Sequence, residues 1–209
     1  MKTRLTPPLE PHVAAAFYAA MLDDVLRETV RAGARFGFDV ALVGHPEEAL
    51  AELRAAAPRG LHVLAQRGAD LGARLAAAVE ELFALEHAPV VVRGSDSPAV
   101  SAADLASALD SLERTDVVIG PDRDGGYHLL GMRRPEPRLF ELPMSTSDVL
   151  AATERRAREL GLDCRRVAPG FDIDTIEDLR FLRNLPDPAL CSATLAFARL
   201  HDLWRHLPA

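Results

Sequence analysis

Four aspartates each follow a short apolar segment and stand beside Gly, Ser or Pro: Asp96, Asp124, Asp172 and Asp174. The end of a buried strand is the expected place for such a residue, and in open α/β sheets ligands bind beyond the carboxyl ends of the strands. Carboxylates gathered there form a hard-oxygen site that suits Mg²⁺ or Mn²⁺ bridging to a diphosphate. The alternative is four turn aspartates that bond to their own backbone.

Three other aspartates are assigned to helix capping. Each stands three residues after a Ser or Thr at an expected helix start, which is the spacing of a capping box with Asp in place of the usual Glu. These pairs are Ser101 and Asp104, Ser145 and Asp148, and Thr175 and Asp178. We therefore leave them out of the predicted metal site.

Basic and glycine residues form a separate signal for anionic oxygens. Helix N-termini and nearby arginines suit phosphate groups. One segment is "KTRL" and the other is "QRGADLGARL" at an expected helix start, although its arginine would also fit a solvated helix and its Asp70 would fit a cap. The candidate nucleotide or phosphate-binding residues in these segments are Lys2, Arg4, Gly68, Asp70, Gly72 and Arg74.

Strands and helices must alternate to position these residues. Apolar periodicity predicts helices over residues 11–36, 46–57, 70–87, 101–113, 146–160 and 175–184. It predicts strands over residues 38–44, 61–66, 88–94, 116–120, 127–132 and 164–168. Such alternation indicates a mainly parallel sheet covered on both faces. The turn "PDRDGG" is too short for a crossover helix, so residues 127–132 are expected to run antiparallel.

The composition is that of a globular α/β domain. The chain has 209 residues, of which 48% are hydrophobic and 26% charged, and a net charge of −7 that argues against nucleic-acid or anionic-membrane binding. No apolar run suits a membrane span and the N-terminus has no signal-peptide core. The two cysteines show no metal spacing. We expect a cytoplasmic protein.

The C-terminal segment is expected to be one amphipathic helix over residues 188–207. Its apolar side would pack on the domain or on a second copy in a homodimer. We therefore divide the chain into a domain over residues 1–186 and a helical tail over residues 187–209.

Several motifs together resemble a family of glycosyltransferase-A-like nucleotide-diphospho-sugar transferases, often described as arsenosugar-biosynthesis-type. The motifs are "KTRLTPPL", "QRGADLGARL", "GSDSP", "GPDRDGGYHLLG", "LPMSTSDVL" and "FDIDTIEDL", in the family's order from residue 2 to about residue 182. The resemblance implies a single-domain, Rossmann-like fold with a mostly parallel sheet, one antiparallel strand and a divalent cation, Mg or Mn. The family more commonly has Cys at Ser97 and Trp at Met144, which we do not expect to abolish metal binding.

The resemblance also implies roles for individual residues. Asp96 is similar to a metal-ligating aspartate of glycosyltransferases, and Asp172 and Asp174 would complete the acidic site. A loop over the donor or acceptor would contain Asp124, Gly125, Gly126 and Tyr127, and Ser95 would join the nucleotide site. Asp124 or Asp174 would serve as a catalytic base, and the sequence does not choose between them. His128 is expected to be structural.

The chain departs from the family at its beginning. Family members start with a strand and a basic loop before "KTRL", whereas this sequence starts inside that loop. The missing strand would lie between those of residues 38–44 and 88–94, so the sheet is expected to lack its central strand.

Three functions agree with these residues. The first is transfer from a nucleoside-diphosphate-sugar donor to a small-molecule acceptor. The second is nucleotidyl transfer to a phosphorylated small molecule, since a related guanylyltransferase of deazaflavin-cofactor synthesis has a "KTRL"-like loop. The third is a non-catalytic nucleotide-binding relative. Release of a nucleoside diphosphate or of pyrophosphate would separate the first two.

Overall fold

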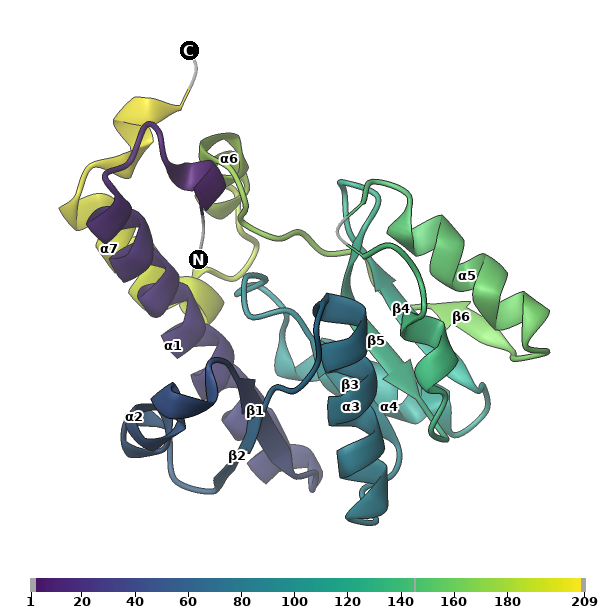
Figure 1. The fold of residues 1–209 in the computed structure, drawn as a ribbon. Helices are drawn as coiled ribbons and strands as arrows, with labels where there is room; N and C mark the ends of the chain where they lie inside the picture. The colour runs from purple at the N-terminus through teal and green to yellow at the C-terminus, as the bar shows by residue number, and fades with distance from the viewer. Residues whose placement is uncertain (1–2, 145, 208–209) are drawn as a thin grey trace.

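The computed structural model describes residues 3–144 and 146–207 (Figure 1). Its α-helices are α1 (Pro11–Phe36), α2 (Leu50–Ala56), α3 (Leu71–Ala84), α4 (Ala102–Leu112), α5 (Val149–Glu159), α6 (Leu179–Arg183) and α7 (Ser192–Leu200). Its strands are β1 (Val40–Gly44), β2 (Leu61–Ala65), β3 (Val90–Arg93), β4 (Val117–Pro121), β5 (Tyr127–Met132) and β6 (Cys164–Arg166). Short 3-10 helices are η1 (Thr3–Leu5), η2 (Glu47–Ala49), η3 (Pro137–Phe140), η4 (Ile176–Asp178), η5 (Pro188–Cys191) and η6 (Leu203–His206).

The described strands form two sheets. β1 and β2 pair in parallel, and the other sheet has the order β3-β5-β4-β6. In it β5 runs antiparallel to both β3 and β4, whereas β4 and β6 are parallel. The expected α/β fold with one antiparallel strand is therefore confirmed, and the tight "PDRDGG" turn is its cause.

Alternating side chains of the larger sheet supply two apolar layers. Val117 and Ile119 of β4 face a core shared with α3, η3 and α5, whereas Val118 between them faces a core shared with α1 and α4. Helices thus cover both faces of this sheet, and its strand ends are held rigidly between two cores.

A third core joins the two ends of the described chain. Figure 1 shows α7 alongside α1, and their apolar residues pack with those of η1 and α6. The buried Asp24 of α1 accepts hydrogen bonds from the backbone nitrogens of Ala193 (3.0 Å) and Thr194 (2.7 Å) at the start of α7. This carboxylate caps α7 from another helix, which fixes the tail in place within the chain.

The tail differs from the single helix that its periodicity predicts. It consists of η5, α7 and η6, and Asp202 adopts a left-handed conformation with φ 47° between the last two. A residue in that region ends an α-helix. The tail still buries Leu195 and Leu203 against the third core, so the apolar pattern is used although the helix is broken.

β1 and β3 are each at the edge of a sheet. Within the described residues, β1 pairs only with β2 and β3 pairs only with β5. The apolar residues Val40 to Val43 of β1 are only partly buried. A further strand between β1 and β3 stays a prediction. In the described part of the chain, no helix has the length and apolar character that crossing a membrane requires.

Candidate active site

Three segments meet at one edge of the larger sheet. They are the loop after β3, the turn after β4 and the extended residues 170–174 that lead into η4. The amide of Gly170 donates to the carbonyl of Pro121 (2.9 Å), and the amide of Ile173 donates to the carbonyl of Asp96 (3.0 Å). These backbone bonds fix the distances between the segments, and each segment carries acidic residues.

Three predicted metal ligands lie together at this edge. Asp96, Asp172 and Asp174 each offer a carboxylate oxygen, and the three oxygens lie within 4.8 Å of one another. We call these residues the acidic triad. The segment "FDID" explains part of this arrangement because Ile173 is fully buried and side chains alternate along an extended chain. Burial of Ile173 turns both of its neighbouring carboxylates to the opposite side.

Gly94 permits the conformation of Asp96. A Cβ atom at position 94 would lie 2.6 Å from Oδ1 of Asp96, so any other residue there would displace this carboxylate. The glycine in "GSDSP" therefore leaves room for the first carboxylate of the triad to fold back over the strand end.

The electrostatics of the triad favour a bound cation. Burial and the neighbouring carboxylates Asp122, Asp174, Asp96 and Asp124 raise the pKa of Asp172 to about 7. Burial, Asp124 and Asp96 also raise the pKa of Asp122 to about 6. Concentrated negative charge on hard oxygens is the environment that Mg²⁺ and Mn²⁺ bind, so the residues present fit the metal that the sequence predicts.

Asp122 is a member of the site that the sequence analysis missed. It directly follows β4 and is partly buried beside the triad, as the effect on its pKa shows. The sequence feature that could have indicated Asp122 is the one used for the other aspartates, an acidic residue immediately after a buried strand. It was hidden because "PDRDGG" also has the composition of an ordinary turn.

Asp124 and the two glycines after it shape the turn. Oδ1 of Asp124 accepts a hydrogen bond from the amide of Gly126 (2.8 Å). For Asp124 the alternative prediction, a turn aspartate that bonds to the nearby backbone, is therefore confirmed. Gly125 has φ 89°, and a Cβ there would lie 1.9 Å from the carbonyl oxygen of Ser147. The turn therefore packs closely against the segment before α5. The partly buried ring of Tyr127 packs against the core shared with α3 and α5.

One of the predicted basic residues lies beside the triad. The Arg4 guanidinium in η1 lies 3.5 Å from Oδ2 of Asp174, and its side chain is 67% exposed. Burial of its neighbour Leu5 in the third core holds this segment in place. Arg4 can therefore reach an anionic group placed over the triad. Lys2, predicted from the same motif, lies outside the described residues.

The glycine-rich segment before α3 is organised by its own contacts. Asp70 caps α3 by accepting a hydrogen bond from the amide of Ala73 (2.8 Å). The alternative prediction for Asp70, a helix cap, is therefore confirmed. The side chain of Arg74 donates to the carbonyl of Gly68 (3.1 Å). The buried Gly72 lies against Phe140, since a Cβ would be 2.4 Å from its carbonyl oxygen. The predicted phosphate role of this segment stays a prediction.

Ser95 is connected to a residue that the sequence did not indicate. Its Oγ lies 2.7 Å from the hydroxyl of Tyr18 on α1. Tyr18 reads as one more apolar position of a long helix, so only the folded structure brings it to the "GSDSP" loop. This contact orients the loop next to Asp96.

His128 packs beneath the backbone of the segments that form the site. Its carbonyl accepts from the amide of Gly94 (2.9 Å), and its buried ring lies against Gly120 and Gly170, where Cβ atoms would come within 2.7 and 2.6 Å of it. Burial lowers the pKa of the imidazole. This packing agrees with the expected structural role and leaves the histidine neutral.

The capping carboxylates lie outside the triad, although that of Asp178 accepts a hydrogen bond from the amide of Asp174 (3.1 Å). Ser101 and Asp104 form a capping box at α4, and Thr175 and Asp178 form one at η4. Both predictions are confirmed. Ser145 lies outside the described residues, and Asp148 precedes α5 without a side-chain capping bond.

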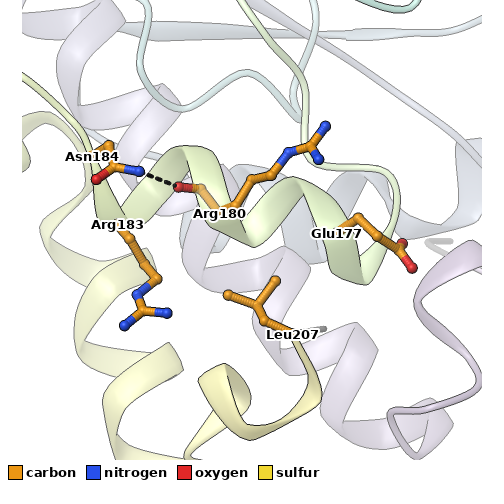
Figure 2. A pocket seen from close by; sticks show the side chains of 5 residues that line it. All are labelled: Glu177, Arg180, Arg183, Asn184 and Leu207. Carbon is orange, nitrogen blue, oxygen red and sulfur yellow. Dashed lines mark hydrogen bonds between the residues drawn. The ribbon is translucent and has the colours of Figure 1, made fainter. Parts of the chain in front are cut away.

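An open pocket of about 530 Å³ lies beside α6, the helix that follows residues 170–174 and η4 in the sequence. Figure 2 shows its lining residues, Glu177, Arg180, Arg183, Asn184 and Leu207. The guanidinium groups of Arg180 and Arg183 point to opposite sides of the helix. They do not converge as the arginines of an anion site would.

The raised pKa of Asp172 leads to a prediction about pH. In metal-free protein the folded state keeps this proton up to about pH 7, whereas the unfolded state loses it near its ordinary value of 3.8. The folded state therefore loses stability as the pH rises between these values. We expect Asp172→Asn to raise the melting temperature little at about pH 5 and most at about pH 8. An equal gain at both pH values would contradict this electrostatic account.

Comparisons with known proteins agree with the fold. The chain is 33% identical over 183 residues to the 2-phospho-L-lactate guanylyltransferase of Methanothermobacter thermautotrophicus, covering 85% of this chain and 76% of the relative. It is 29% identical over 186 residues to the phosphoenolpyruvate guanylyltransferase of Chloroflexus aggregans, covering 86% and 89%. A crystal structure from Desulfovibrio desulfuricans G20, of a protein provisionally assigned as a nucleotide-diphospho-sugar transferase, superposes with a TM-score of 0.87 at 29% identity, covering 100% and 93%.

Together with the fold, these relatives define the chain as a transferase enzyme with a nucleotide substrate. The reading as a non-catalytic relative is therefore not kept. The chain belongs to the family described as "Uncharacterized protein conserved in bacteria (DUF2064)", whose model matches residues 28–146. Those residues include β3, β4, β5 and Asp96, whereas Asp172 and Asp174 lie beyond them.

Proposed function

We propose that the chain is a divalent-metal-dependent transferase that uses a nucleoside-diphosphate-sugar donor. The observation that carries the proposal is the acidic triad, whose three carboxylate oxygens lie within 4.8 Å of one another at the end of a sheet. The raised pKa of Asp172 supports it, because neighbouring carboxylates contribute to that rise, and closely grouped carboxylates are the ligands that a divalent cation prefers. The likeness to the D. desulfuricans structure over the whole chain also supports a sugar-nucleotide donor.

The acidic triad would hold Mg²⁺ or Mn²⁺. When bound, such a cation supplies positive charge that stabilises the diphosphate leaving group. Arg4 would contact the donor phosphates from the side of Asp174, to which it is already adjacent. Ser95, positioned by Tyr18, would bind the donor next to Asp96.

The acceptor hydroxyl needs a base that is not occupied by the metal. Asp174 belongs to the triad, so of the two bases predicted from the sequence we favour Asp124. Asp122 is a further candidate, because a carboxylate with a pKa of about 6 is closer to the working pH and therefore a better proton acceptor than an ordinary aspartate. Both lie in the turn after β4.

Nucleotidyl transfer is the second candidate. It is favoured by the two relatives named as guanylyltransferases, one of them 33% identical. A nucleoside triphosphate would then react with a phosphorylated small acid and release pyrophosphate. The same triad and the same basic segment would serve both reactions, since both transfer a group from a nucleotide with a phosphate leaving group.

Product analysis separates the two functions. We would first identify ligands by the rise in melting temperature across nucleotides and nucleotide sugars with and without Mn²⁺. The stabilising donors would then be incubated with sugar acceptors or with phosphorylated carboxylic acids. Release of a nucleoside diphosphate supports glycosyl transfer, and release of pyrophosphate supports nucleotidyl transfer. Metal-independent turnover of either donor would contradict the proposed role of the triad.

A further inference from the structure

An aromatic ring on α6 contacts side chains from both acid-bearing loops. The Arg123 guanidinium carbon lies 4.5 Å from the centroid of the Phe181 ring, and the Phe171 ring centroid lies 5.2 Å from it. Arg180 on the same helix lies 4.8 Å from this centroid. We call Arg123, Phe171 and Phe181 the ring contact.

The partners of Phe181 are next to the acids in the sequence. Arg123 stands between Asp122 and Asp124 in the turn after β4, and Phe171 immediately precedes Asp172. The ring contact therefore joins the turn after β4 to the segment of residues 170–174. These are two of the three segments that form the site.

The ring contact counteracts electrostatic repulsion between the acidic residues of the two segments. Both segments carry carboxylates, Asp122 and Asp124 in one and Asp172 and Asp174 in the other, and like charges repel one another. This repulsion opposes the close approach of the two segments. Hydrogen bonds from the amide of Gly170 to the carbonyl of Pro121 and from the backbone of Asp172 to the carboxylate of Asp122 also join them. A guanidinium over an aromatic face adds attraction and brings positive charge near the acids.

We propose that Phe181 is a positioning residue: through Phe171 it holds the segment that carries the triad ligands Asp172 and Asp174, and through Arg123 it holds the turn with Asp122 and Asp124 against that segment. It acts through the loops and does not itself contact the metal or the nucleotide. The expected effect of Phe181 on metal affinity rests on the proposed function. Its role in holding the two segments together does not depend on that function.

The test uses four variants of the whole chain. Phe181→Leu removes the ring face without changing charge, and Phe181→Trp restores a face. Arg123→Met removes the guanidinium at an exposed position, where misfolding is not expected. Phe197→Leu is the matched control, because Phe197 is also a partly buried aromatic residue but packs with Phe17 and His201 in the third core.

The first measurement is hydrogen exchange of residues 121–126 and 170–174 in metal-free protein. We expect Phe181→Leu and Arg123→Met to accelerate it by about 3- to 10-fold, whereas Phe181→Trp and Phe197→Leu leave it near wild type. The second is Mn²⁺ affinity without nucleotide, which Phe181→Leu should weaken by about 3- to 10-fold. Phe181→Trp should recover it.

Each outcome decides the matter. Unchanged exchange in both ring-contact variants, or equal acceleration by Phe197→Leu, would overturn the proposal. Loss of nucleotide affinity with unchanged exchange would also overturn it, and would assign Arg123 to direct phosphate binding. If wild-type protein binds no Mn²⁺ but the exchange results are as expected, the positioning role stands and the metal dependence of the proposed function fails.

Discussion

Asp96→Asn is expected to weaken Mn²⁺ binding by more than about 100-fold and to abolish metal-dependent nucleotide binding. Loss of a residue outside the ligand shell typically costs 10- to 100-fold, so removal of a charged ligand should exceed that range. The fold should be little affected, because relief of like-charge repulsion with Asp172 offsets what the carboxylate contributes. The Asp96 carbonyl, which accepts from the amide of Ile173, is unchanged. Mn²⁺ titration and thermal unfolding measure the two effects.

Asp104→Asn is the matched control for the same chemical change. Asp104 accepts hydrogen bonds from the amide (2.9 Å) and hydroxyl (2.6 Å) of Ser101, so it belongs to the cap of α4. We expect Mn²⁺ affinity to stay at the wild-type value and stability to fall by up to about 1 kcal/mol. If the two variants gave the same Mn²⁺ titration, the division of aspartates into ligands and caps would be wrong.

That division shows which parts of the site can be predicted from sequence. A capping box depends on residues three positions apart, so Ser101 and Asp104 are recognisable without any knowledge of the fold. An acid after a buried strand is recognisable by the same kind of local pattern, provided that a parallel sheet is expected. Asp96 follows β3 in this way. Asp172 and Asp174 were predicted from the same pattern but lie in the extended residues 170–174 beyond β6, and the structure brings all three within 4.8 Å of one another.

Contacts between distant segments could not be predicted in this way. Tyr18 and Phe181 occupy apolar positions of helices, and nothing in their local sequence indicates Ser95 or Arg123 as partners. Asp24 resembles a solvated helix acid, yet it is buried and caps α7, about 170 residues away. Each role depends on which face of a helix meets which loop, and that is decided by the packing of the three cores.

β1 and β3 are the strands concerned in the prediction of a further strand between them. Both strands are apolar, as strands buried on both faces of a parallel sheet are. In the structure Val40 to Val43 of β1 and Val91 and Val92 of β3 are nevertheless only partly buried, and within the described residues each strand has a single partner. Each strand therefore has an edge of backbone groups that an added strand could pair. We propose that a β-strand fits between them.

A chain extended at its N-terminus by an apolar strand of about five residues and a basic loop tests this proposal. An added strand that pairs with both edges would cover their valines, and its end would then lie between those of β1 and β3, where a nucleotide binds in such sheets. We expect the melting temperature to rise by about 5–10 °C and nucleotide affinity to increase by more than about tenfold.

The matched control is an extension of equal length built from Gly and Ser, which adds chain without strand propensity or apolar area. Only the apolar extension should raise the melting temperature, and only it should slow hydrogen exchange at the backbone amides of β1 and β3. Equal melting temperatures and equal nucleotide affinities in the original and extended chains would show that the two sheets need no strand between them. The partial burial of β1 would then be a stable feature of this fold.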